Sequence, residues 1–407
     1  MPIIEVKQVT KIFGSDPKRA IPLLQQGWTK DRILKETHQT VGVNRVSFAI
    51  EPGEIFVIMG LSGSGKSTLV RLLNRLIEPT DGQVLIGGKD IVKADAEELR
   101  SIRRKQISMV FQKFALFPHR TVLENVEYGL EVQGVPKKLR REKSLQALEL
   151  VGLAGWESKR PDQLSGGMQQ RVGLARALAN DPDVLLMDEA FSALDPLIRK
   201  DMQDELLQLQ TKMKKTIVFI THDLNEALRI GDRIALMKDG AVVQIGTPEQ
   251  ILTSPANDYV ERFVEDVDLS KVLTASHVMR RPETITPDRG PRVALQLMKD
   301  QGISNLYVVN ANRTLLGAIT AEDASAAVKE GKTLQDIIIT DVPRVSPDTL
   351  LNDLFQPVGE ARVPVAVIDN NDRLLGIIIK GAVLAALAGN QNVEGRWSNG
   401  GYSETSA

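Results

Sequence analysis

The chain has 407 residues, and its 51 lysines and arginines against 52 aspartates and glutamates give a formal net charge of -1. This balance argues against a dedicated nucleic-acid-binding protein, and the absence of cysteine excludes disulfides and thiolate metal sites. The length exceeds what one hydrophobic core usually supports, so we expect two or more domains.

The first elements expected along the chain are strands interrupted by an insertion. Residues 3–8 and 46–50 are predicted strands, and the apolar run 55–59 is typical of a buried strand. The insertion covers about residues 14–42 and is polar and basic. Its apolar side chains recur at roughly helical spacing, which predicts one or two amphipathic helices: Leu23, Leu24, Trp28 and Ile33.

Residues 60–68, Gly-Leu-Ser-Gly-Ser-Gly-Lys-Ser-Thr, match the phosphate-binding loop pattern G-x-x-x-x-G-K-[ST]. The glycines let backbone N–H groups close around a phosphate. Lys66 supplies a positive charge near the β- and γ-phosphates, and Ser67 offers a hydroxyl to Mg²⁺. We therefore predict a nucleoside triphosphate site made by Gly60, Leu61, Ser62, Gly63, Ser64, Gly65, Lys66, Ser67 and Thr68.

Two later segments are predicted to be parallel strands with functional residues at their C-terminal ends. The runs 184–189 and 216–222 are apolar until their last residues, as expected in an open α/β sheet. Between them and the phosphate loop, about residues 113–164 are helical in pattern and predict a helical subdomain inserted into the core.

That helical segment leads into Leu164-Ser-Gly-Gly-Met-Gln-Gln, a string with hydrogen-bond donors at the start of a predicted helix. The hydroxyl of Ser165 and the N–H groups of Gly166 and Gly167 precede a predicted helix. Hydroxyl, backbone donors and helix dipole are therefore expected to face an anion.

The phosphate loop and this second string, in this order, resemble the Walker A and signature sequences of ATP-binding-cassette (ABC) transporter ATPases. The resemblance covers residues 1–265 and implies an α/β P-loop NTPase cassette with a RecA-like core and a helical subdomain. It also implies ATP and Mg²⁺ as cofactors. A single cassette per chain implies a head-to-tail homodimer with two ATP molecules between the subunits.

The resemblance assigns roles residue by residue. Glu189 is implied as the general base, with Lys66, Gln112 of the Q-loop and the switch residue His222 as the other catalytic groups. Mg²⁺ is implied at Ser67, Gln112 and Asp188. The D-loop residue is Asp195, and the residues implied to contact the ATP of the opposite subunit are Ser165, Gly166, Gly167 and Gln169. Phe13 is the best match to the aromatic that stacks on adenine, with a core role as the alternative.

An internal repeat follows the cassette. The strings beginning Leu306-Tyr-Val-Val and Val365-Ala-Val-Ile each run through an Asn/Asp turn into Leu-Leu-Gly. The pair resembles tandem CBS domains of α+β structure, which we expect at 271–330 and 331–389. Residues 390–407 are rich in Gly, Asn and Ser and are expected to be disordered.

The CBS resemblance implies an adenosine ligand, with cyclic di-AMP as one candidate. Thr320 and Asp323 match the Thr and Asp of G-x-x-T-x-x-D, which bind ribose in nucleotide-binding CBS domains. The alternative is a helix N-cap box. The second repeat has Ile379 and Ala382 at these places, so two equivalent sites are not expected. Arg362 is the candidate to face the ligand's phosphate, with a solubilising role as its alternative.

The order of cassette, insertion and CBS pair resembles the ATPase of glycine betaine/proline betaine importers. This implies a peripheral subunit at the cytoplasmic face of the membrane that energises osmoprotectant import and is regulated by its CBS domains under osmotic stress. The implied partner is a separate membrane permease that carries or recruits a substrate-binding domain, and no nucleic-acid partner is expected. The alternatives are an importer ATPase for another solute, such as choline or an amino acid, and a soluble non-transport ABC ATPase.

Overall fold

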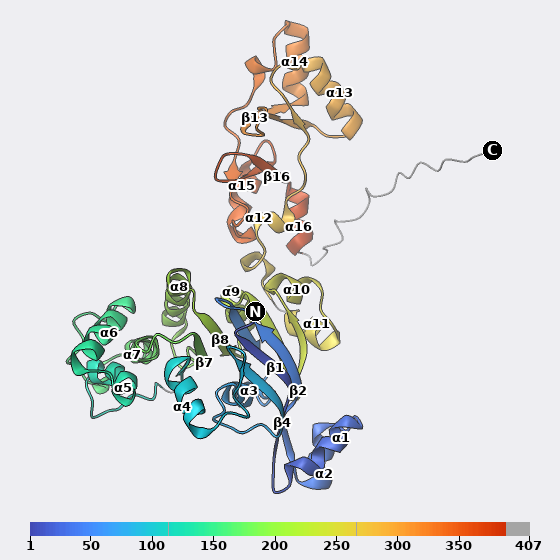
Figure 1. Cartoon of the computed structure of the whole chain (residues 1–407). Coiled ribbons are helices and arrows are strands. Elements are labelled where there is room, and N and C mark those ends of the chain that lie inside the picture. The colour runs from blue at the N-terminus through green and yellow to red at the C-terminus, as the bar shows by residue number, and fades with distance from the viewer. Residues whose placement is uncertain (113, 266, 388–407) are drawn as a thin grey trace. The chain divides into compact units, whose positions relative to one another are not determined.

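The computed structural model describes residues 1–112, 114–265 and 267–387, and the chain divides into two compact units at residue 266 (Figure 1). The tail predicted over 390–407 lies outside the described residues. Among the described residues, no helix is both long enough and apolar enough to span a membrane.

A six-stranded sheet forms the centre of the first unit, in the order β10-β9-β3-β8-β7-β6. Its strands are β3 (Ile55–Met59), β6 (Ile107–Val110), β7 (Val184–Asp188), β8 (Thr216–Thr221), β9 (Arg233–Lys238) and β10 (Ala241–Gly246). All neighbours pair in parallel except β10 with β9. Met59 pairs with Thr221, and Asp188 pairs with Ile220. The loops that follow β3, β7 and β8 therefore leave the sheet at one edge.

A second, antiparallel sheet packs on the first. It has the order β2-β1-β4-β5, with β1 (Ile4–Phe13), β2 (Thr40–Ile50), β4 (Asp81–Ile86) and β5 (Lys89–Asp90). One apolar core takes side chains from both sheets. Within it the rings of Phe48 and Phe56 stack with their centroids 5.0 Å apart. This core holds the two sheets together.

The insertion between β1 and β2 is helical, as the spacing of its apolar residues predicts. It contains a 3-10 turn (Pro17–Ala20), α1 (Ile21–Gln25) and α2 (Lys30–Thr37). These elements have a small core of their own, in which Ala20 and Ile33 pack with Ile12 of β1 and Val41 of β2. The insertion is thereby anchored to the ends of the two strands that flank it.

The remaining helices of the first unit either flank the sheets or form a group beside them. The group consists of α5 (Val122–Val132), α6 (Lys137–Leu150) and α7 (Gly166–Leu178), which pack on one another (Figure 1). The structure thus adds α7 to the helices expected over 113–164. The others are α3 (Lys66–Leu73), α4 (Ala96–Lys105), α8 (Pro196–Met213), α9 (Leu224–Ile230), α10 (Pro248–Thr253) and α11 (Asp258–Val264).

The second unit contains the predicted internal repeat as two sheets of the same design. The first sheet has β11 (Thr284–Ile285), β12 (Asn305–Val309) and β13 (Leu315–Thr320), and the second has β14 (Arg344–Val345), β15 (Val365–Ile368) and β16 (Leu374–Ile378). In each, the first pair is parallel and the second antiparallel. The helices are α12 (Ala275–Val278), α13 (Pro291–Gln301), α14 (Ala321–Glu330), α15 (Phe355–Glu360) and α16 (Lys380–Leu387). Backbone hydrogen bonds join the repeats, among them those from the N–H of Leu315 to the carbonyl oxygen of Asp372 at 2.9 Å and from the N–H of Leu374 to that of Arg313 at 3.0 Å.

Each repeat completes its core with a segment that precedes the other repeat. Leu273 and Val278 pack in one core with Val365 and Ile378 of the second repeat. In the other direction, Leu334 packs in the core of the first repeat. The cores therefore do not follow the sequence boundary at 330/331, and each repeat contributes side chains to the core of the other.

This exchange generates a prediction for Leu273→Ala. Leu273 is 1% exposed, so the truncation leaves a cavity in the core of the second repeat and should cost about 2–4 kcal/mol there. Amide hydrogen exchange on the full chain should show protection lost mainly in β15 and β16, and less in β12 and β13. Leu384→Ala is the matched control, because Leu384 is 65% exposed. Equal loss of protection in both repeats would contradict the exchange of segments.

Candidate active site

The loop after β3 has a backbone that requires glycine at two positions. Gly60 has φ +147° and Gly65 has φ +101°. A Cβ atom at Gly60 would lie 2.3 Å from the carbonyl oxygen of Met237, and one at Gly65 would lie 2.3 Å from that of Gly42. Side chains at either position would collide with backbone, so the loop keeps its curvature only with glycine.

Lys66 lies at the start of α3 and is 5% exposed. Its ammonium donates hydrogen bonds to the carbonyl oxygens of Gly60 at 2.8 Å and Leu61 at 3.1 Å. Burial lowers the pKa of Lys66, and the negative charges of Glu189 and Asp188 act in the opposite direction. The loop therefore holds a cation whose burial is compensated by two carboxylates from β7 and the residue after it.

Ser67 and Asp188 bring two oxygen atoms together beside Lys66. The hydroxyl of Ser67 donates to Oδ1 of Asp188 at 2.9 Å, and a guanidinium nitrogen of Arg71 lies 3.6 Å from Oδ2. Sequence reasoning named Ser67 and Asp188 and missed Arg71, which lies on α3 with no motif to mark it. Asp188 is buried at the end of β7, so these contacts fix where its carboxylate points.

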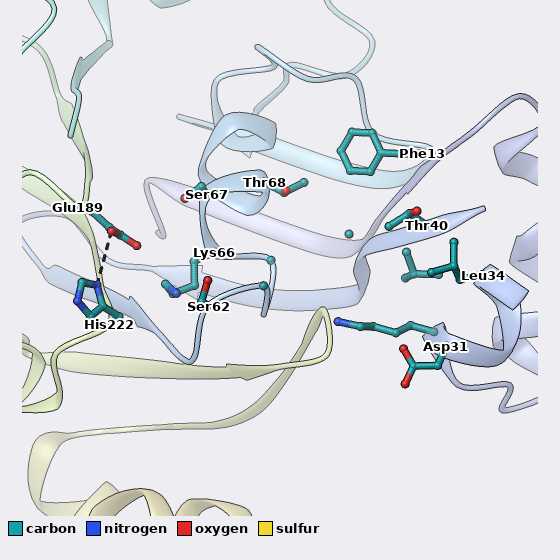
Figure 2. A pocket seen from close by; sticks show the side chains of 15 residues that line it. Phe13, Asp31, Leu34, Thr40, Ser62, Lys66, Ser67, Thr68, Glu189 and His222 are labelled. Atoms are coloured by element: carbon teal, nitrogen blue, oxygen red, sulfur yellow. Dashed lines mark ion pairs between the residues drawn. The ribbon is translucent and has the colours of Figure 1, made fainter. Parts of the chain in front are cut away.

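Glu189 is contacted by side chains from the two neighbouring strand ends. Nε2 of Gln112 donates to its Oε2 at 3.3 Å and to Oγ of Ser192 at 3.1 Å. Nδ1 of His222 lies 3.5 Å from the same carboxylate oxygen (Figure 2). Glu189 has φ +46°, a left-handed conformation that costs energy in a residue with a side chain. The structure thus places Gln112, Glu189 and His222 in one cluster. It adds Ser192, which precedes the predicted D-loop residue Asp195 by three positions in the sequence.

A cavity of about 570 Å³ connects this cluster with Phe13. It is lined by Phe13, Lys30, Asp31, Leu34, Thr40, Val41, Gly42, Ser62, Gly63, Gly65, Lys66, Ser67, Thr68, Glu189 and His222. Phe13 is 39% exposed, so the alternative of a core residue does not describe it. Phe13 and Leu34 lie toward one end of the cavity, and Lys66, Glu189 and His222 toward the other (Figure 2).

The signature residues lie elsewhere on the first unit. Ser165 is the exposed N-cap of α7, and its hydroxyl accepts from the N–H of Met168 at 3.3 Å. Gly166 and Gly167 open the helix, and neither they nor Ser165 line the cavity. Asp195 is exposed at the start of α8 and also lies outside its lining. In one chain, therefore, the two halves of the predicted ATP site are apart.

Gln169 makes hydrogen bonds within its own chain. Its Nε2 donates to the carbonyl oxygens of Pro161 at 3.0 Å and Leu164 at 3.2 Å. Both bonds join α7 to the segment that leads into Ser165. In this structure Gln169 holds the signature segment in position.

The candidate regulatory residues form a helix cap in the second unit. The hydroxyl of Thr320 accepts from the N–H of Asp323 at 3.1 Å and donates to its carboxylate at 2.6 Å. This is the N-cap of α14, the alternative that the sequence left open. Arg362 is exposed between α15 and β15. A ligand role for these residues remains a proposal.

A phosphate loop that requires glycine, an acidic pair at the end of β7 and a separate signature helix define an ABC ATPase. The family model described as ABC transporter matches residues 43–192, and the CBS domain model matches 275–330 and 334–389. The fold class predicted from the sequence is thereby confirmed.

Comparison with known proteins gives the family. The glycine betaine transport ATP-binding protein OpuAA of Bacillus subtilis is 63% identical over 96% of this chain and 94% of its own length. The glycine betaine/proline betaine transport system ATP-binding protein ProV of Escherichia coli is 54% identical over 94% and 97%. A dimeric structure of the ATP-binding cassette MJ0796, in a post-hydrolysis state bound to ADP and Pi, matches with a TM-score of 0.51 and 35% identity over 60% of this chain and 98% of that one. The chain belongs to the family of ATP-binding subunits of glycine betaine/proline betaine ABC transporters with two C-terminal CBS domains.

The contacts of Gln169 lead to a prediction for Gln169→Ala. The variant loses two hydrogen bonds that hold the signature segment, each worth about 0.5–1.5 kcal/mol. ATP hydrolysis should fall roughly three- to tenfold, while equilibrium ATP binding to the isolated chain stays unchanged. Gln146→Ala, at an exposed position of α6, is the control. Weaker ATP binding to the isolated chain would instead place Gln169 at its own subunit's nucleotide.

Proposed function

We propose that this chain hydrolyses ATP to energise the import of a quaternary-amine osmoprotectant through a separate membrane permease, as a peripheral subunit at the cytoplasmic face of the membrane. The observation that carries the proposal is the cavity that runs from Phe13 past Lys66 to Glu189. The end of the cavity with Phe13 and Leu34 suits a nucleobase. The other end has the ammonium of Lys66 and the carboxylate of Glu189, which suit phosphoryl transfer. The solute is proposed from the names of the relatives, since no residue described above contacts it.

In the proposed complex, adenine lies on Phe13 and the triphosphate follows residues 60–68. Lys66 exchanges its two carbonyl partners for oxygens of the β- and γ-phosphates. Ser67, Asp188 and Gln112 would hold Mg²⁺. The 2.9 Å contact between Ser67 and Asp188 supports this, because Mg²⁺ takes a few protein oxygens together with phosphate oxygens and water. The ion would neutralise charge on the transferred phosphoryl group.

Glu189 is proposed to accept a proton from the attacking water. Glu189 lines the cavity, while Gln112 and His222 both contact its Oε2. These neighbours restrict the carboxylate to one orientation, which is what a base must have for in-line attack. Gln112 and His222 are proposed to report the presence of the γ-phosphate through the same contacts.

A homodimer is proposed because one chain has only part of the site. Ser165, Gly166 and Gly167 offer a hydroxyl and backbone donors at the start of α7, directed to no nucleotide of their own subunit. In a head-to-tail dimer they would face the γ-phosphate held by the partner's loop, with Asp195 at the same interface. The matching cassette structure is dimeric and bound to ADP and Pi, which supports a dimer.

The permease is proposed to dock beside Gln112. A cavity of about 280 Å³ opens next to it, between β6 and helices α5 and α7. Phe111 and Tyr128, at 37% and 36% exposure, line it together with Arg176. A recess with exposed aromatic side chains and two arginines, Arg103 and Arg176, suits a short amphipathic helix of a membrane partner. Its position next to the Q-loop would couple docking to the phosphate site.

Choline or an amino acid as solute, and a soluble ABC ATPase, are the alternatives to the proposal. Purification of the complex from membranes, followed by ATP-dependent uptake into vesicles, separates them. Uptake of glycine betaine in preference to choline and amino acids is expected. Recovery of the chain without any membrane permease would favour the soluble alternative.

The role of Glu189 is tested by Glu189→Gln, which removes the proposed base and keeps the shape of the side chain. Hydrolysis should fall by roughly 10²–10⁴-fold, and solute uptake should fall with it. ATP binding should persist, and size-exclusion chromatography with ATP should show a lasting dimer. Glu149→Gln on the exposed face of α6 is the control. Near-normal turnover of Glu189→Gln would exclude this residue as the base.

The CBS pair is proposed to regulate the cassette by binding cyclic di-AMP or another adenosine ligand near Thr320, Asp323 and Arg362. The two repeats differ at these positions, because Ile379 and Ala382 replace the Thr and Asp in the second repeat. This difference supports a ligand site in the first repeat without an equivalent in the second. The proposed effect is inhibition, through a shift in the open–closed equilibrium of the cassette dimer. Such coupling is typically about 1–3 kcal/mol, or 5–150-fold.

Regulation is tested by ending the chain at Ser270. The cassette has its own core over Met1–Asp266, so the shortened chain should retain ATP-driven uptake. Addition of cyclic di-AMP to vesicles should slow uptake by the full-length complex and leave the shortened one unaffected. An equal response of both complexes, or no binding by calorimetry, would refute the proposed role of the CBS pair.

A further inference from the structure

The insertion between β1 and β2 contributes to the cavity with a face that no sequence motif predicts. Lys30, Asp31 and Leu34 of α2 line the cavity together with Phe13 and the phosphate loop. Leu34 is 46% exposed, although the residue beside it, Ile33, is fully buried. The helix therefore packs one face against the strands and presents a large apolar side chain to the cavity.

The register of β1 and β2 fixes the position of this helix. Phe13 pairs with Thr40 and Ile12 pairs with Val41 at the end of the ladder. The Ile12–Val41 pair packs with Ile33 of α2 in the insertion's core. The same two strand ends thus carry Phe13 and support the helix that carries Leu34, so the spacing between these two side chains is set by packing.

A second attachment joins α2 to the phosphate loop. The ammonium of Lys30 lies 3.4 Å from Oδ1 of Asp239 in the turn between β9 and β10. The next residue in that turn, Gly240, donates its N–H to the carbonyl oxygen of Ser64 at 3.0 Å. The helix is therefore held at the strand ends by apolar contacts and near the loop by an ion pair.

Between Phe13 and Leu34, the surface of the cavity includes Gly42, which has no side chain. Gly42 of β2 lies in the lining, and a Cβ atom there would come within 2.8 Å of the Phe13 ring and 3.4 Å of the Thr68 side chain. Figure 2 shows Phe13 and Leu34 at the same end of the cavity, with Thr40 between them in this view. Two exposed apolar side chains over a bare floor are what a planar ring buries between them.

We propose that α2 is the second wall of the base site: the nucleobase lies between Phe13 and Leu34, and the insertion thereby contributes to nucleotide affinity. This inference rests on the proposed binding of ATP in this cavity. It assigns to residues 14–39 a function in binding the base, separate from the phosphate contacts made by residues 60–68. The ligand class is a nucleoside triphosphate, recognised at this end by its planar base.

The test compares two ligands on the full-length chain by calorimetry with Mg²⁺: ATP, and inorganic tripolyphosphate, which lacks base and sugar. Leu34→Ala should weaken ATP binding roughly five- to tenfold, the loss expected when part of a leucine's apolar contact is removed, and leave tripolyphosphate binding unchanged. Leu34→Phe should restore ATP affinity, because an aromatic ring provides the same wall. Lys35→Ala, exposed on the same helix and outside the lining, is the control and should change neither ligand.

Other outcomes separate this inference from the proposed function. Unchanged ATP affinity in Leu34→Ala, or an equal loss for both ligands, would overturn the assignment of Leu34 to the base. Lys66→Ala should weaken both ligands because it acts on the phosphates. If Lys66→Ala leaves ATP binding intact, the nucleotide site itself is wrong, and the inference about α2 is overturned with it.

Discussion

The parallel pairing of β3, β7 and β8 is the constraint on which the rest of the site depends. Parallel strands end at one edge of a sheet, so the phosphate loop, the acidic pair and His222 are brought together without any long-range motif. The strands are buried along their whole length and mostly apolar, which makes their register costly to change. The side chains at this edge are therefore held in position by the buried strands that carry them.

The buried cation at this edge has partners within the protein. Lys66 is buried, and two carbonyl oxygens with the field of Asp188 and Glu189 compensate the loss of water around its ammonium. Glu189 in turn is contacted by Gln112 and His222. A triphosphate that enters would replace carbonyl oxygens by charged oxygens at the same cation. The ammonium proposed to bind the triphosphate is thus held by neutral partners that a phosphate could displace.

The two units have different structural logic. The cassette has a continuous core between its two sheets. The small insertion has a separate core, which includes the ends of β1 and β2. The CBS pair has cores that exchange segments, so neither repeat is complete without the other. A change in one repeat is therefore expected to affect the other, which suits the proposed regulatory role of the pair.

The sequence by itself determined the class of fold, the phosphate loop, the residues at the strand ends and the repeat, because each depends on local pattern: a glycine spacing, an apolar run, a strand followed by a polar residue. It also determined that residues 14–42 contain amphipathic helices. Only the tertiary structure decided which residues those helices bring to the cavity, since Leu34 and Lys30 reach it through the register of β1 with β2 and a turn two hundred residues later. It likewise decided that Gln169 bonds to its own loop and that Leu273 belongs to the second repeat. The bonds of Gln169 reach only five and eight residues back, but the contacts of Leu34, Lys30 and Leu273 join segments distant in the chain. No local pattern specifies the partner of a side chain once it leaves its own element.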